Sequence, residues 1–193
     1  MFTGIIKKTG IVKKIIYNKK DTWIGIKSGL KLSNKDLGLS INCSGVCLTL
    51  DQIYKGLYYF YLSKETIRIS NFKKIKLNTI INLEKPLKYG NEISGHFVQG
   101  HVDTTSKLKK VNISGKSLYL YFSIIKLFKK YLKYKSSIAI NGVSLTIAKV
   151  FVNSFLVVVI PSTLKLTNLK NIKKNDIVNI EIDIIAKYIK KLN

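Results

Sequence analysis

Hydrophobic and polar residues alternate with a period of two through most of this chain of 193 residues. The alternating runs are short, rich in β-branched and aromatic residues, and separated by Gly, Asn, Asp or Lys, which is typical of β-strands joined by turns. Many short strands at this spacing predict a mainly all-β chain of small antiparallel barrels, because closing a sheet removes its exposed edges. The runs are GIVKKIIYN, TWIGIK, LYYFYLS, ETIRIS and TIINLE in the first half, and SLYLYFS, FLVVVI and DIVNIEI in the second.

Two segments have apolar residues at the helical spacing of three and four positions instead. Each predicts a short amphipathic helix, one inside the second half and one at the C-terminus. The C-terminal helix is either an oligomer contact or a cover for its own barrel, and the sequence alone supports both. The apolar positions are Ile124, Leu127, Phe128, Tyr131 and Leu132 in the first helix, and Ile185, Tyr188, Ile189 and Leu192 in the second.

The chain contains a tandem repeat. SINCSGVCLTL begins at Ser40, and SIAINGVSLTI begins 97 positions later at Ser137, with Cys47 replaced by Ser144. The same offset places ETIRISNFKKIKLNTIINLE over STLKLTNLKNIKKNDIVNIE, and the two beginnings correspond as TGI over QGH. Repetition on this scale indicates a duplicated unit. We expect two homologous domains over 1–96 and 97–182, followed by a C-terminal helix over 183–193.

The net charge of +24 suggests a nucleic-acid partner, but the kind and distribution of the basic residues argue against one. Only Arg68 among the 34 basic residues is an arginine, the residue type that forks onto phosphates and bases. The lysines occur as scattered doublets and form no stripe. We interpret them as the product of an AT-rich coding sequence and expect no nucleic-acid partner. The charge still favours solubility and attracts anions at low salt.

Cysteine usage and hydrophobic segments predict a soluble, cytoplasmic protein. Cys43 and Cys47 are too few for a secreted disulfide framework, and without a second ligand pair they predict no metal site. The start MFTGIIKK has too short an apolar run for a signal peptide, and FLVVVI is far below the roughly 20 residues that span a bilayer. We therefore expect no membrane partner.

Seven motifs distributed along the chain together resemble riboflavin synthase of the α-chain type. They are MFTGII at the start, GVCLTL at 45–50, KETIRISN at 64–71, GHFVQGHVD at 95–103, INGVSLTIA at 140–148, IPSTL at 160–164 and NIEIDIIAKYI at 179–189. The resemblance implies two tandem Greek-key β-barrels, each of which binds one lumazine, and a homotrimer. In such a trimer the active site forms between the N-terminal barrel of one subunit and the C-terminal barrel of its neighbour.

The resemblance also implies the reaction. One molecule of 6,7-dimethyl-8-ribityllumazine transfers a four-carbon unit to a second, which gives riboflavin and 5-amino-6-ribitylamino-uracil, with no metal, flavin or nucleotide cofactor. The sequence agrees, since it contains no Walker loop, GxGxxG or HExxH motif and only two histidines. Repeating one pocket supplies the two similar sites that a reaction between two copies of one molecule needs. Because donor and acceptor have different fates, the pockets should differ where the chemistry occurs, as Cys47 and Ser144 do.

Five residues carry the chemistry that the resemblance implies: Cys47, His101, Ser144, Thr146 and Asp183. His101 would assist proton removal from a ring methyl of one lumazine, since imidazole titrates near neutral pH. Ser144 would add to the electrophilic carbon of the other lumazine or hold a nucleophilic water, and Thr146 would bond the pteridine edge. Asp183 would hold a ribityl hydroxyl or the transition-state charge.

The remaining candidates line the two pockets. Cys47 and Thr49 occupy in the first barrel the places of Ser144 and Thr146, and a small hydrophobic pocket wall is also a credible role for Cys47. We expect a structural or interface role for His96. The predicted substrate-binding residues are Phe2, Gly4, Ile5, Ile6, Ser40, Cys47, Leu48, Thr49, Tyr61, Leu62, Ser63, Lys64, Glu65, Thr66, Gly100, His101, Val102, Lys135, Ser144, Leu145, Thr146, Val158, Val159, Ile160, Pro161, Ser162 and Thr163.

Two other functions remain open at this point. Antenna proteins that carry lumazines or flavins share the tandem fold without catalysis, and they should lack the catalytic side chains that this chain keeps. A nucleic-acid-binding barrel rests on charge alone and predicts affinity that falls steeply with salt.

Overall fold

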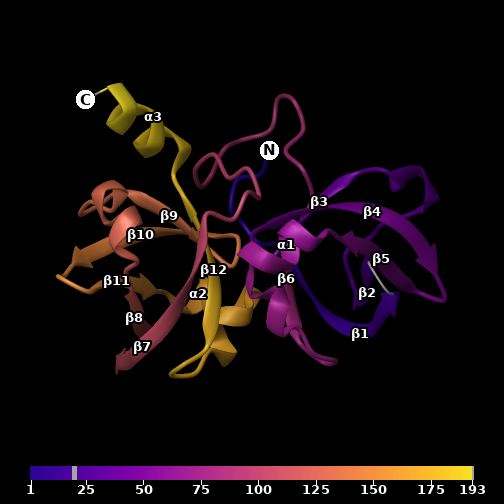
Figure 1. The fold of residues 1–193 in the computed structure, drawn as a ribbon, viewed down its shortest axis with the longest axis horizontal. Helices are drawn as coiled ribbons and strands as arrows, with labels where there is room; N and C mark the ends of the chain where they lie inside the picture. The colour runs from indigo at the N-terminus through magenta and orange to yellow at the C-terminus, as the bar shows by residue number, and fades with distance from the viewer. Residues whose placement is uncertain (19–20, 193) are drawn as a thin grey trace.

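Two closed antiparallel barrels form the body of the computed structural model, which describes residues 1–18 and 21–192, with side chains described as far as Ile189 (Figure 1). The first barrel runs in the order β1-β2-β5-β4-β3-β6 and closes where β6 pairs with β1. Its strands are β1 (Lys8–Asn18), β2 (Asp21–Ser28), β3 (Ser40–Cys43), β4 (Val46–Tyr54), β5 (Leu57–Leu62) and β6 (Ile80–Glu84).

The second barrel repeats this topology. Its order is β10-β11-β8-β7-β12-β9, which is the same closed circuit begun at a different strand. In both barrels the third strand lies between the fourth and the sixth, as in a Greek key. The mainly all-β, two-barrel prediction is therefore confirmed. The strands are β7 (Thr104–Ser114), β8 (Ser117–Ser123), β9 (Ser137–Ile140), β10 (Val143–Val150), β11 (Ser154–Val159) and β12 (Ile177–Ile182).

Short helices occupy equivalent connections in the two halves. After β5 and β11 the chain forms a six-residue α-helix, α1 or α2, followed by a 3₁₀ helix, η2 or η4. None of the described helices is long and apolar enough to cross a membrane. The helices are η1 (Asn34–Asp36), α1 (Lys64–Ile69), η2 (Asn71–Lys74), η3 (Lys126–Tyr131), α2 (Pro161–Leu166), η4 (Asn168–Asn171) and α3 (Ile184–Leu192).

The prediction of a strand over ETIRIS is wrong, because α1 covers this segment. Ser63 caps the helix, since its hydroxyl accepts the backbone N–H of Thr66 at 3.0 Å. Glu65 and Arg68, three residues apart, pair through two hydrogen bonds of 2.8 and 2.6 Å. These local contacts outweigh a period-two pattern only six residues long.

The predicted helix near the middle of the second half forms, but as the 3₁₀ helix η3 and not as an α-helix. Phe128 and Tyr131 pack against the core of the second barrel, whereas Leu127 is 66% exposed. A 3₁₀ helix has three residues per turn, so positions 128 and 131 share a face that position 127 does not.

The C-terminal helix α3 is confirmed and projects away from the barrels (Figure 1). Ala186 packs against the core of the second barrel, while Ile185, Tyr188 and Ile189 are each more than half exposed. One face of α3 therefore packs on the second barrel, as a cover for that barrel would. The other face is exposed in the single chain, as an oligomer contact would be. Leu192, the last residue of the predicted apolar stripe, lies beyond the described side chains.

Buried amides hold the two barrels together. Asn82 of β6 donates to the carbonyl of Asn141 at 2.9 Å, and the equivalent Asn179 of β12 donates to the carbonyl of Ser44 at 2.8 Å. The two residues of each pair come from different barrels, so the contact is nearly two-fold symmetric. Buried amides require such partners, and this polar network therefore fixes one orientation of the barrels.

Two glycines meet at the centre of this contact. Gly45 and Gly142 both have φ in the left-handed region, at +88° and +74°. A Cβ on Gly142 would lie 2.7 Å from the backbone nitrogen of Gly45 and 2.8 Å from the side-chain oxygen of Asn42. Only glycine lets the barrels approach this closely.

Gly142→Ala should destabilise the protein far more than Gly115→Ala. Gly115 also has a left-handed φ, of +58°, but a Cβ there would meet nothing within 4 Å. The control should lose about 1 kcal/mol through backbone strain, and Gly142→Ala about 3 kcal/mol or more, because the barrels must also separate. Urea unfolding of both variants measures the difference. Equal losses would contradict a close-packed contact between the barrels.

Candidate active site

Two short segments outside the strands cross between the barrels. Residues 1–6, here called the N-terminal lip, lie against the second barrel, and residues 97–102, the linker lip, lie against the first. Ile6 is accordingly buried in the core of the second barrel, and Val102 in the core of the first. The lips also pair with each other, since Phe2 and Val98 exchange backbone hydrogen bonds of 2.7 and 3.0 Å.

Each lip bonds the strand that carries the central residue of the repeated motif. The backbone N–H of Cys47 donates to the carbonyl of Gly100 at 2.8 Å, and the N–H of Ser144 donates to the carbonyl of Gly4 at 2.8 Å. Both glycines have a left-handed φ, of +78° and +76°, and a Cβ at either would lie 2.7 Å from the Cβ of the facing residue. The repeat therefore places Cys47 and Ser144 at equivalent ends of the two barrels. We call the end where Cys47 faces Gly100 the first mouth, and the end where Ser144 faces Gly4 the second mouth.

The first mouth opens into a cavity of about 200 Å³. The linker lip forms one wall, and the turn of α1 forms the other. Cys47 is half-buried there, and the side chain of His101 is exposed at the rim. The lining residues are Val46, Cys47, Thr66, Ile69, Ser70, Gly100, His101 and Val102, of which Cys47, Thr66, Gly100, His101 and Val102 are predicted substrate-binding residues.

The second mouth contains a pair of side chains that the sequence analysis did not connect. Nδ1 of His96 lies 2.7 Å from the hydroxyl oxygen of Ser144. The backbone N–H of His96 donates to the carbonyl of Thr3 at 3.2 Å, which ties the imidazole to the N-terminal lip. Gly95 makes this approach possible, because a Cβ there would lie 2.1 Å from that same carbonyl oxygen.

Burial favours the neutral form of the His96 ring. Burial lowers the pKa of His96 from its usual value, and the charge of Asp183 opposes this effect. His96 is 9% exposed, and among the described residues its Nε2 has no hydrogen-bond partner. A neutral imidazole can accept a proton from the hydroxyl that it contacts. Sequence reasoning gave His96 a structural or interface role, and only its position beside Ser144 in space points to proton transfer.

Several other predicted residues already have partners within the chain. Asp183 accepts the backbone N–H of Ile185 at 3.0 Å at the start of α3, and the Glu65 carboxylate is bound by Arg68. The hydroxyl of Tyr61 donates to Asp21 at 3.0 Å, which raises the pKa of Tyr61. The side chains of Thr49, Lys64, Lys135, Thr146, Ile160, Pro161 and Ser162 are exposed, whereas those of Phe2, Leu48, Leu62, Leu145 and Val159 are buried, and Ile5, Ser40, Ser63, Val158 and Thr163 are half-buried.

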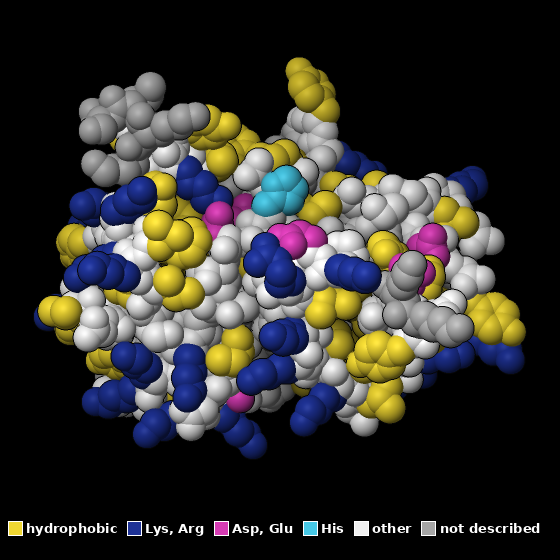
Figure 2. Space-filling model, in the orientation of Figure 1, with side chains coloured by type: hydrophobic (Ala, Val, Ile, Leu, Met, Phe, Trp, Pro, Cys, Tyr) yellow, Lys and Arg dark blue, Asp and Glu magenta, His cyan; other side chains and the backbone are white. Residues whose placement is uncertain are grey.

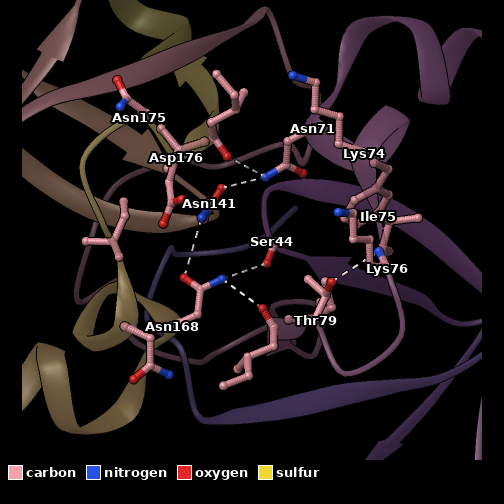
Figure 3. A pocket seen from close by; sticks show the side chains of 17 residues that line it. Ser44, Asn71, Lys74, Ile75, Lys76, Thr79, Asn141, Asn168, Asn175 and Asp176 are labelled. Carbon is pink, nitrogen blue, oxygen red and sulfur yellow. Dashed lines mark hydrogen bonds between the residues drawn. The ribbon is translucent and has the colours of Figure 1, made fainter.

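Other hollows lie away from the two mouths. A groove of about 460 Å³ between the barrels is lined by the interface amides, with Asn71, Asn141 and Asn168 turned toward one another (Figure 3). On the face shown in Figure 2, lysines and arginines are spread without forming a band. The described residues contain no group of three or more His, Cys, Asp or Glu side chains that could hold a metal ion.

The comparisons with known proteins agree with the presence of two tandem domains. The model of the lumazine binding domain matches residues 3–86 and again 99–183. Riboflavin synthases from Photobacterium leiognathi and Escherichia coli are 36% and 35% identical to the chain, covering 100% and 95% of it and 88% and 87% of the relatives. The chain belongs to the riboflavin synthase family.

Solved structures give the same result for the fold. LumP complexed with 6,7-dimethyl-8-(1'-D-ribityl) lumazine matches with a TM-score of 0.81 and 25% identity, over 94% of this chain and 98% of LumP. LumP complexed with riboflavin matches with a TM-score of 0.84 and 24% identity, over 94% and 99% of the two chains. The family match and these structures confirm the predicted tandem barrels.

A buried glutamate should make stability depend on pH. Burial raises the pKa of Glu181 from 4.5 to about 7, while hydrogen bonds from the backbone of Gln99 and Gly100 and the charge of Lys187 lower it, and Asp103 raises it. Between these two pKa values the folded chain holds a proton that the unfolded chain has lost. The free energy of unfolding should therefore fall, relative to that of Glu181→Gln, by roughly 3 kcal/mol as the pH rises from 4.5 to 7.

Urea unfolding across this pH range measures the difference between the two proteins. Glu65→Gln is the control, because its carboxylate is exposed and Arg68 lowers its pKa, so its effect falls below this window. A difference between wild type and Glu181→Gln that stays constant from pH 4.5 to 7 would contradict the raised pKa.

Proposed function

We propose that this chain catalyses the dismutation of two 6,7-dimethyl-8-ribityllumazine molecules, giving riboflavin and 5-amino-6-ribitylamino-uracil. The observation that carries the proposal is the pair of equivalent mouths, one with Cys47 and the other with Ser144 bonded to His96. Two similar pockets suit two copies of one molecule, and different side chains at the same position suit their different fates. Alignment of two reactants can supply roughly 7–11 kcal/mol of the barrier.

At the second mouth, His96 and Ser144 act together. The hydroxyl of Ser144, or a water that it holds, adds to the electrophilic carbon of the acceptor, and the neutral ring of His96 takes its proton. The 2.7 Å contact and the lowered pKa of His96 support this role. Thr146, two residues further along β10, bonds the edge of the pteridine.

At the first mouth, Cys47 and the linker lip bind the second lumazine. His101 stands at the rim of the cavity and assists proton transfer from the ring methyl, which leaves the carbanion that attacks the acceptor. Asp183 holds a ribityl hydroxyl or stabilises transition-state charge, and its effect on the pKa of His96 supports a place near the second mouth. The reaction requires no metal, flavin or nucleotide cofactor.

We infer a cytoplasmic homotrimer in which the first mouth of one subunit faces the second mouth of its neighbour. The exposed Ile185, Tyr188 and Ile189 on α3 support this inference, since a helix face of this kind is usually covered in an assembly. The domain boundaries of 1–96, 97–182 and 183–193 remain our proposal, with the lips exchanged across them.

A lumazine carrier is the second candidate, and the match to LumP complexed with ribityl lumazine favours it. A carrier needs two ligand pockets but no proton-transfer group. The partly buried contact between His96 and Ser144 therefore supports the enzyme.

Purified protein mixed with 6,7-dimethyl-8-ribityllumazine should form riboflavin, with one uracil product for every two lumazines consumed. Absorbance and separation of the products measure this ratio. Ser144→Ala and His96→Ala should each lower kcat by about 100-fold or more, because a positioned general base contributes on this scale. The double variant should lose no more than the worse single variant, since the two side chains act as one unit.

Lys116→Ala is the control, because this exposed lysine lies in the turn between β7 and β8 and is not among the predicted site residues, so kcat should stay unchanged. Tight binding of lumazine without formation of riboflavin would contradict the enzyme proposal and support a lumazine carrier. Losses for His96 and Ser144 that add in the double variant would show that the two residues act separately.

A further inference from the structure

Two buried glutamates lie at equivalent positions, at or next to the last residue of the sixth strand of each barrel. Glu84 closes β6, and Glu181 lies near the end of β12. Each is at most 5% exposed, at 5% and 2% respectively. Neither was predicted as a site residue, although the repeat places one over the other. Both carboxylates are directed at the backbone of a lip.

Glu84 holds the N-terminal lip. One carboxylate oxygen accepts the backbone N–H and the hydroxyl of Thr3, both at 2.8 Å, and the other accepts the N–H of Gly4 at 3.1 Å. The carbonyl of Gly4 in turn accepts the N–H of Ser144. A carboxylate on the first barrel is therefore connected, through Gly4, to the mouth of the second barrel.

Glu181 holds the linker lip in the same manner. Its oxygens accept the backbone N–H of Gln99 at 2.6 Å, of Gly100 at 2.9 Å and of His101 at 3.1 Å. The carbonyl of Gly100 accepts the N–H of Cys47. Here the carboxylate belongs to the second barrel and the mouth to the first.

A carboxylate suits this place because it accepts hydrogen bonds with both oxygens. The three donors at Glu181 are distributed over both of them, so the NH₂ group of a glutamine would face at least one N–H. Burial raises the pKa of both glutamates, which shows that the charged form is costly to bury. Among the described residues, every hydrogen bond that these two carboxylates accept comes from a lip, which points to positioning.

We propose that Glu84 and Glu181 are crossed positioning residues, each of which holds the lip that closes the mouth of the other barrel. Glu84 sets the backbone beside Ser144, and Glu181 sets the backbone beside Cys47. The inference rests on the proposed function only for the identity of the ligand. A purely structural role would disturb the barrel to which each glutamate belongs, whereas a positioning role disturbs the opposite mouth.

A thiol at each mouth distinguishes these roles. Cys47 is half-buried at the first mouth, while Cys43 is fully buried and its raised pKa keeps its thiol unreactive. A Cys47→Ser/Ser144→Cys background moves the reporter thiol to the second mouth. The rate of its modification by iodoacetamide, measured without ligand, reports how well each lip covers its mouth.

Glu181→Gln should raise the modification rate of Cys47 by about tenfold and leave the thiol introduced by Ser144→Cys within about twofold, since losing hydrogen bonds to a charged group is worth this much. Glu84→Gln should do the reverse. The proposal would be overturned if either variant changed the modification rate of the thiol on the glutamate's own barrel, changed both thiols equally, or changed neither.

A milder variant keeps the test decisive where Glu84→Gln fails to fold. Thr3→Val removes one of the three hydrogen bonds to Glu84 and preserves the shape of the side chain. It should raise the reactivity of the introduced thiol and leave that of Cys47 unchanged. Glu181→Asp serves likewise for the linker lip, because the shorter acid keeps its charge but loses its reach. Folded variants without these changes would overturn the proposal.

Repeating the labelling with 6,7-dimethyl-8-ribityllumazine separates the two proposals. Protection of both reporter thiols by the lumazine supports the proposed ligand. A crossed pattern without any protection would leave the positioning residues standing and refute the proposed function. Protection by the lumazine without a crossed pattern would support the proposed ligand and refute the positioning role of the two glutamates.

Discussion

Two backbone hydrogen bonds determine how the rest of the site is arranged. At each barrel mouth a strand presents an N–H, from Cys47 or from Ser144, and a glycine carbonyl of a crossing lip accepts it. A buried N–H without a partner is costly, so the lip must lie there. Once it does, it covers the pocket, contributes an apolar residue to the opposite core and requires a carboxylate behind it to satisfy its own N–H groups.

This exchange of lips makes the two barrels one functional unit. The asparagine contacts and the meeting of Gly45 with Gly142 fix the distance between the barrels, and the lips use that distance to reach across. Burying the carboxylates of Glu84 and Glu181 to hold the lips lowers the stability of the folded chain, because a charged group is costly to bury. Such costs are common where a geometry must be held for chemistry. The two mouths share this backbone arrangement and differ in their side chains. Ser144 has His96 beside it, whereas Cys47 has no hydrogen-bond partner among the described side chains.

The sequence predicted the architecture well, because strand alternation and the offset of 97 positions are properties of the chain itself. It did not predict that the lips cross, since periodicity identifies a strand but not the barrel against which it packs. The roles of His96, Glu84 and Glu181 were missed for the same reason. The overlay of Glu84 on Glu181 was a usable signal, because an acid near the end of an apolar strand in both halves needs a shared partner. The ETIRIS segment failed because capping by Ser63 decided a short, ambiguous pattern.

The most direct test of the whole account is a crystal structure of the protein with 6,7-dimethyl-8-ribityllumazine. We expect one lumazine against Cys47 and the linker lip and a second against Ser144 and the N-terminal lip, with the His96 contact retained. A lumazine bound only in the groove between the barrels, or at one mouth alone, would contradict it.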